Sequence, residues 1–145
     1  MKTKIIVISI AVAFIAIFIA IFTLKPYMVS ENFEKILNVD FNTVDKVVIA
    51  SGSTGKYCTI ESKEDLQKFF DMFKGIKLRK DFNQKPKAGI IFTVTLIKSG
   101  DILLQFNFGY DKVTIFNNDK STRYISNKNI DYEQIKKIAS TYNID

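Results

Sequence analysis

The chain has 145 residues, room for one domain, and a formal net charge of +6. It contains one cysteine, which excludes an intramolecular disulfide, and no histidine, which excludes histidine as a general base or a zinc ligand. Its hydrophobic fraction of 47% is ordinary for a globular protein, but the apolar residues are concentrated at the N-terminus.

The segment from Ile5 to Leu24 carries no charge, and its polar residues are Ser9 and Thr23. A helix of this length extends for about 30 Å, the thickness of the hydrocarbon core of a bilayer. We therefore expect residues 1–24 to form an N-terminal signal-anchor, a single transmembrane helix.

A cleaved secretory signal peptide is the alternative for this segment, because it also begins with basic residues such as Lys2 and Lys4. A signal peptide has an apolar stretch of about 7 to 15 residues, followed by small residues before the cleavage site. This run is longer and ends in IFTLKPYMVS, without an A-x-A pattern. The pattern favours an uncleaved anchor; cleavage would make the rest of the chain a secreted protein.

The flanking charges predict the orientation of the helix. Lys2 and Lys4 precede the apolar run, whereas Lys25 alone follows it directly, with Glu31 and Glu34 beyond. The positive-inside rule then gives a single-pass cell-membrane protein with a cytoplasmic N-terminus and an extracellular C-terminal domain.

The remaining chain divides into a juxtamembrane connector, residues 25–44, and an extracytoplasmic domain, residues 45–145. In the connector we expect a short helix behind a Ser30 cap. In the domain, KVVIAS and YCTIE are β-rich runs separated by a glycine-containing turn, a pattern that predicts a β-hairpin.

Two helices are predicted in the domain by their N-caps. Ser62 and Asp65 form a weak capping box before a helix over residues 63–74, and Asp131 and Gln134 cap a C-terminal helix. Apolar residues follow both caps at helical spacing, which predicts that each helix buries one face.

Between these helices the apolar period switches to two, which predicts strands. The strand sequences are IKLRKDF, GIIFTVTLIK, ILLQFNF, KVTIF and TRYIS. In ILLQFNF the alternation assigns one face to Ile102, Leu104, Phe106 and Phe108. Short links without βαβ alternation predict an α+β fold of two layers, an antiparallel meander sheet with helices packed on one face.

The stretch ASGSTGKYC, residues 50–58, resembles two catalytic motifs in its letters. A serine-lysine pair, Ser53 with Lys56, would need the two residues on one helical face, but this loop joins two strands. A phosphate-binding loop would need a glycine where Ala50 stands and a serine or threonine where Tyr57 stands. We interpret the stretch as a hairpin turn.

Other reactive side chains also have structural interpretations. Cys58 shares a strand face with Ile60 and is expected to be buried as a small hydrophobe. The carboxylates at helix starts and near turns are expected to be solvated or to act as caps: Glu64, Asp65, Asp81, Asp101, Asp111 and Asp119. We therefore predict no catalytic residue, no metal site and no cofactor, and a protein that is not an enzyme.

One stretch, KGIKLRKDFNQKPK, is strongly basic and is the candidate site for an anionic partner. Asp81 is its single acidic residue. Its basic residues are Lys74, Lys77, Arg79, Lys80, Lys85 and Lys87. The alternative is a solvated edge strand whose lysines prevent pairing with other chains. We expect no nucleic acid as partner, because the domain lies outside the membrane.

The order VVIASGSTGKYCTIESKEDLQKFFDMFKGIKL, then GIIFTVTLIKSGD and a late RYIS, resembles small exported domains of unknown function from low-GC Gram-positive bacteria. In these a strand, a small glycine turn, a helix start and an antiparallel meander follow a membrane or lipid anchor. The resemblance implies a cell-surface location and an α+β fold, and implies no catalytic residue.

These patterns lead to one functional hypothesis with two alternatives. The leading one is a non-enzymatic, membrane-tethered extracytoplasmic domain that recognises a protein or an anionic envelope polymer. The first alternative is an inhibitor or immunity protein for an exported enzyme or toxin. The second is an enzyme that uses carboxylates or Lys56, which would need a pocket with convergent polar groups. The sequence leaves the oligomeric state open.

Overall fold

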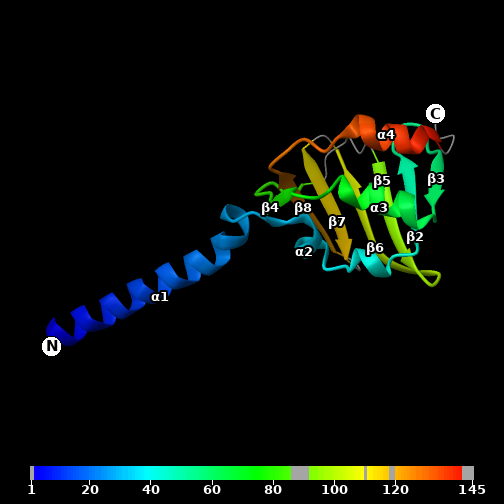
Figure 1. The fold of residues 1–145 in the computed structure, drawn as a ribbon. Coiled ribbons are helices and arrows are strands. Elements are labelled where there is room, and N and C mark those ends of the chain that lie inside the picture. The colour runs from blue at the N-terminus through cyan, green and yellow to red at the C-terminus, as the bar shows by residue number, and fades with distance from the viewer. Residues whose placement is uncertain (1, 86–91, 110, 118–119, 142–145) are drawn as a thin grey trace.

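The structure is a computed structural model that describes residues 2–85, 92–109, 111–117 and 120–141. Figure 1 shows a long N-terminal helix, α1 (Lys2–Met28), that projects away from the rest of the chain. Among the described residues, α1 is the one helix long and apolar enough to cross a membrane, over Ser9–Met28, and none of that span is buried. A signal sequence near an N-terminus can share these properties.

The remaining described residues form one antiparallel sheet of eight strands with a few helices, which confirms an α+β fold with an antiparallel sheet. The spatial order is β1-β4-β8-β7-β6-β5-β2-β3, so β1 and β3 are the edges. The strands are β1 (Glu31–Asn32), β2 (Lys46–Ser51), β3 (Tyr57–Ile60), β4 (Lys77–Lys80), β5 (Phe92–Lys98), β6 (Asp101–Phe108), β7 (Lys112–Asn117) and β8 (Lys120–Ser126). β4 and β5 are consecutive in the chain, but β8, β7 and β6 lie between them in the sheet.

The helical segments that accompany the sheet are short. They are α2 (Phe33–Leu37), a 3-10 turn (Phe41–Thr43), α3 (Lys63–Asp71) and α4 (Tyr132–Thr141). Each of the three α-helices contributes buried side chains to the same hydrophobic core as the strands.

Phe73, just after α3, lies at the centre of this core and is 1% exposed. Its ring stacks on Phe33 of α2 with centroids 4.5 Å apart, and it meets the edge of Phe106 of β6 at 6.1 Å. Phe69 of α3 contacts the same ring at 5.2 Å. The core thus joins α2, α3 and the sheet, and it includes Phe33 from the segment interpreted as a connector.

Both predicted helix caps are confirmed. Ser62 Oγ accepts a hydrogen bond from Asp65 N at 3.1 Å, and Asp131 Oδ1 accepts one from Gln134 N at 3.0 Å. These bonds satisfy backbone donors that the first turn of a helix leaves unpaired. The helix predicted over residues 63–74 is shorter than expected, because the chain leaves α3 in turns that end at Gly75, whose φ is +73°.

The expectation of a helix capped by Ser30 is wrong. The residues after Ser30 instead form β1, in which Glu31 pairs with Leu78 and Asn32 with Lys77. The helix begins only at Phe33, whose backbone N–H donates to Ile76 O at 3.0 Å. A polar strand of two residues is too short to show an alternating apolar pattern. The sequence therefore does not predict β1, which is recognised only by its pairing with β4.

Ile102 does not share the face of Leu104, contrary to the alternation of the sequence. Leu96 pairs with Leu104, but the next pair is Ile97 with Ile102, so that β6 has one extra residue, a β-bulge. A shift of one residue turns a side chain to the opposite face of a strand. Ile102 is accordingly 69% exposed, while Phe106 and Phe108 are buried as expected.

Candidate functional site

The last turn of α1 docks on β4, the strand that carries the predicted basic residues. Arg79 Nη1 donates a hydrogen bond to Tyr27 O at 3.1 Å, and Lys80 Nζ lies 5.1 Å from the centroid of the Tyr27 ring. The ring of Phe82 stacks on the ring of Tyr27, with centroids 4.7 Å apart and an interplanar angle of 17°. The basic strand therefore lies at the end of the domain nearest to α1.

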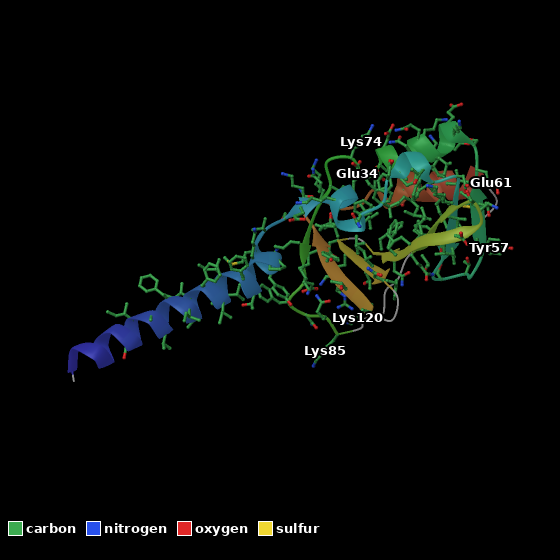
Figure 2. All side chains as sticks on the ribbon, turned by 90° about the horizontal axis from the view of Figure 1, so that it is seen from below. Glu34, Tyr57, Glu61, Lys74, Lys85 and Lys120 are labelled. Atoms are coloured by element: carbon green, nitrogen blue, oxygen red, sulfur yellow. The ribbon has the colours of Figure 1, made fainter. Side chains whose placement is uncertain are left out.

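The six predicted site residues do not form one patch. Lys74 lies in the turns after α3, where its ammonium pairs with Asp71 at 2.6 Å. Figure 2 shows Lys74 beside Glu34 on the helix side of the sheet, whereas Lys85 points away from the opposite side. Lys87 lies outside the described residues. The structure thus separates Lys74 from the other described members.

Four of the predicted basic residues lie on β4 and in the turn that follows it, and we name them the basic edge: Lys77, Arg79, Lys80 and Lys85. Lys77 and Lys85 are exposed, and the other two are half-buried. Among the described residues no carboxylate lies within ion-pair distance of these four cations. Their charge is therefore not neutralised by any described residue of the domain.

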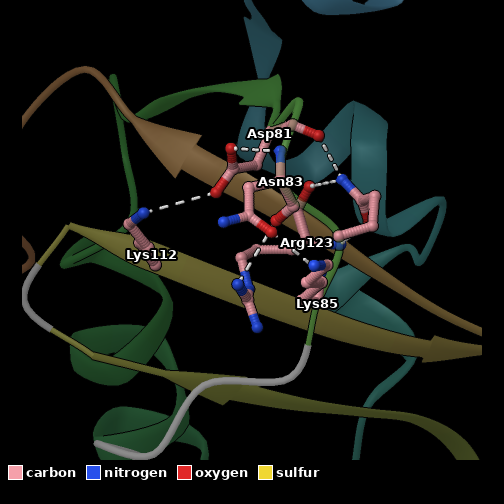
Figure 3. A network of polar contacts seen from close by, with 6 residues as sticks. Asp81, Asn83, Lys85, Lys112 and Arg123 are labelled. Carbon is pink, nitrogen blue, oxygen red and sulfur yellow. Dashed lines mark hydrogen bonds and ion pairs between the residues drawn. The ribbon is translucent and has the colours of Figure 1, made fainter.

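Asp81, the acidic residue within this stretch, is 5% exposed, so the expectation that it is solvated is wrong, whereas its bond from Asn83 N fits the expected capping role. Figure 3 shows the polar network around it. One carboxylate oxygen accepts from Asn83 N at 2.9 Å and the other lies 3.3 Å from Lys112 Nζ on β7. The buried Arg123 of β8 donates through Nη1 to Asn83 O at 3.3 Å. A buried carboxylate requires such partners.

Gln84 fastens the same turn to β8. Its side-chain oxygen accepts from Arg123 N at 2.9 Å, and its side-chain nitrogen donates to Arg123 O at 3.1 Å and also to Asp81 O. The side chain thereby pairs with the backbone of β8 beyond the end of β4. The turn that carries Phe82 and Lys85 is held at a fixed place on the sheet.

The pKa of Asp81 is set by opposing effects. Burial, the largest of them, would raise the pKa, but the Asn83 N–H, the ammonium of Lys112 and the charge of Arg123 together hold it below the ordinary value. The carboxylate is therefore ionised at neutral pH. Its ion-pair partner Lys112 is thus neutralised within the domain, unlike the cations of the basic edge.

The remaining reactive groups lie away from this site. Ser53 and Lys56 are exposed in the β2–β3 turn, where Ser51 N donates to Lys56 O at 2.8 Å and Gly55 has a φ of +70°; this confirms the hairpin turn. Cys58 is buried as predicted, and burial raises the pKa of its thiol against weaker backbone hydrogen bonds. Within the described part of the chain, no three histidine, cysteine or carboxylate residues are grouped as metal ligands.

Two hollows that the sequence did not reveal flank the core. A groove of about 630 Å³ lies between the segment of residues 39–45 and α3, with Phe41, Leu66 and Phe70 among its apolar lining. A smaller cavity of about 290 Å³ lies between the end of α1 and strands β4 and β8. The second adjoins the basic edge, since Lys80 lines it.

Comparisons with known proteins give no relative. The chain matches no protein-family model, and neither the curated proteins nor the solved structures contain a significant match. The resemblance to small exported domains therefore stays a hypothesis, and functional inference rests on the geometry around β4.

Proposed function

We propose that the chain is a membrane-tethered extracytoplasmic binding domain, a non-enzymatic two-layer α+β module that recognises an anionic component of the cell envelope through its basic edge. The observation that carries the proposal is the contact between the two parts of the chain. The apolar helix α1 ends at the strand whose cations have no acidic partner among the described residues.

The properties of α1 support the tether. Its apolar side chains are exposed over Ser9–Met28, which is stable only if something other than this domain covers them. A bilayer is a suitable environment, because the helix satisfies its own backbone hydrogen bonds. Lys2 and Lys4 on one side and Lys25 on the other favour a cytoplasmic N-terminus, so the sheet domain lies outside.

The electrostatics of the basic edge support an anionic partner. Four cations that no described carboxylate neutralises attract anions over roughly a Debye length, about 8 Å at physiological ionic strength. The exposed pair Lys77 and Lys85 can meet a partner without disturbing the fold, whereas Arg79 and Lys80 also hold Tyr27. Binding through such a surface is expected to weaken as salt rises.

Charge reversal tests the proposal. We expect Lys77→Glu/Lys85→Glu to lose most of the anionic polymer, lipid or protein that the immobilised full-length protein captures from solubilised envelope. A matched control, Lys56→Glu/Lys98→Glu, changes the net charge equally at two exposed lysines, one in the β2–β3 turn and one at the end of β5. The control is expected to capture as the wild type does.

The outcomes of this capture separate the hypotheses. Equal capture by both variants and the wild type would show that the basic edge does not bind the anionic partner. If all three retained a single protein in equimolar amount, an inhibitor or immunity protein would explain the result better. Equal weakening of both variants would mean that net charge, not the basic edge, drives the association.

A further inference from the structure

The cavity of about 290 Å³ beside the basic edge lies where α1 leaves its apolar stretch. Its lining combines the two parts of the chain: Lys25 and Val29 come from the end of α1 and the residues after it, and Leu78 and Lys80 come from β4. Tyr124 of β8 closes it on the sheet side. The cavity thus exists only because α1 docks on the domain.

The sequence of α1 fixes the depth of this cavity relative to a bilayer. Leu24 is the last residue of the uncharged run, and Lys25 is the first charged residue after it. Tyr27, two residues after Lys25, stacks on Phe82, and tyrosine is enriched at the level of lipid headgroups. With α1 across the membrane, the cavity opens at the headgroup layer.

The chemistry of the lining is amphipathic. Two lysines, Lys25 and Lys80, line it together with one acidic residue, Glu31, whose carboxylate is 3.4 Å from Lys35 Nζ. The remaining wall is largely apolar, with Val29, Leu78 and the ring of Tyr124. A site with surplus positive charge and an apolar wall fits a molecule that carries a phosphate and a hydrocarbon portion together.

We propose that this cavity binds the headgroup of an anionic phospholipid from the outer leaflet of the membrane that α1 spans. The lipid phosphate lies between the ammonium groups of Lys25 and Lys80, and its glycerol portion lies against Leu78 and Tyr124. A free phosphate ion or a wall polymer has no hydrocarbon part to occupy the apolar wall. The proposal rests on the proposed function in one respect, that α1 is a membrane anchor with the domain outside.

Such a lipid would orient the domain. Tyr27, Lys80 and Arg79 already connect α1 to β4, and a lipid phosphate bound to both Lys25 and Lys80 would bridge the same two elements. The β4 end of the sheet would then stay close to the bilayer surface. The exposed lysines of the basic edge would be held near the anionic envelope.

Lipid retention by the full-length protein tests the cavity. The protein is inserted into nanodiscs of equal parts phosphatidylcholine and phosphatidylglycerol, transferred to detergent, and its retained lipids are counted by mass spectrometry. We expect the wild type to enrich phosphatidylglycerol. Lys25→Gln/Lys80→Gln is expected to lower this enrichment about fivefold for each lysine removed. Lys56→Gln/Lys98→Gln, outside the cavity, serves as the matched control.

Two further measurements control for misfolding of the variant and distinguish a lipid phosphate from a free phosphate ion. Lys25→Arg/Lys80→Arg keeps both cations and is expected to keep the enrichment. Excess inorganic phosphate is expected not to displace the lipid. Unchanged enrichment in Lys25→Gln/Lys80→Gln, equal retention of the two lipids by the wild type, or displacement by inorganic phosphate would each overturn the lipid site. None of these results affects envelope capture through Lys77 and Lys85, so the two proposals fail separately.

Discussion

Truncation of Phe73 to alanine is expected to lower the free energy of unfolding by about 3 to 5 kcal/mol. The ring is 1% exposed and contacts Phe33, Phe69 and Phe106, so its loss leaves a cavity where α2, α3 and the sheet meet. Phe73 follows the end of α3, and Phe69 of that helix belongs to the same core. A loss this large is a substantial share of the stability of a small domain.

Urea unfolding of the full-length protein in a mild detergent, followed by circular dichroism, measures this effect. The matched control is Tyr57→Ala on the edge strand β3, where the ring is 70% exposed. The control is expected to stay within about 0.5 kcal/mol of the wild type. A cost below about 1 kcal/mol for Phe73→Ala would show that this aromatic cluster is not the centre of the core.

Two aspartates in the middle of α1 are expected to abolish stable insertion into the membrane. Phe14 and Phe18 lie within the apolar span on exposed positions, and each aspartate at the centre of a spanning helix costs about 2.5 to 3.5 kcal/mol. Phe14→Asp/Phe18→Asp should therefore move from the membrane pellet to the soluble fraction after carbonate extraction. The control Phe14→Leu/Phe18→Leu keeps the span apolar and should stay in the pellet.

The same fractionation separates an anchor from a signal peptide. An anchored wild type stays in the pellet with its own N-terminus intact. A wild-type protein recovered from the medium, with a new N-terminus near the end of α1, would contradict the tether. The lipid cavity would then lack Lys25 or present it on a free chain end.

The regular parts of the fold could be predicted from the sequence because their signals are local. A capping serine or aspartate and the bond it accepts lie within four residues of one another, as at Ser62 and Asp131. Alternation likewise marks buried residues along one strand, such as Val94 and Leu96. These patterns depend on the period of a helix or strand and need no knowledge of the partner element.

The features that escaped prediction depend on long-range pairing. β1 exists only because β4 lies beside it, and the bulge opposite Leu96 and Ile97 depends on how β5 and β6 pair. The sequence of a single strand predicts neither its partner strand nor its register. For the same reason the sequence does not predict the order of the eight strands, above all the connection from β4 to β5 that passes three strands.

The candidate site was predicted in part. The basic stretch is present on β4, but sequence proximity grouped Lys74 with Lys85, which points away from the opposite side of the sheet. It also hid the role of Asp81, because Lys112 and the buried Arg123 that surround it are far along the chain. The contact of Arg79 with Tyr27, which joins the site to α1, likewise spans 52 residues.

The orientation of the domain on the bilayer tests the account most directly. A fluorophore is attached to Lys85→Cys or to Tyr57→Cys in the full-length protein, reconstituted in bilayers that contain a headgroup-linked quencher. Cys58 is buried with a raised pKa, so the introduced cysteine reacts first. Six strand spacings separate β4 from β3, about 30 Å. We predict strong quenching at position 85 and little at position 57; equal quenching, or stronger quenching at position 57, would contradict a basic edge held at the membrane surface.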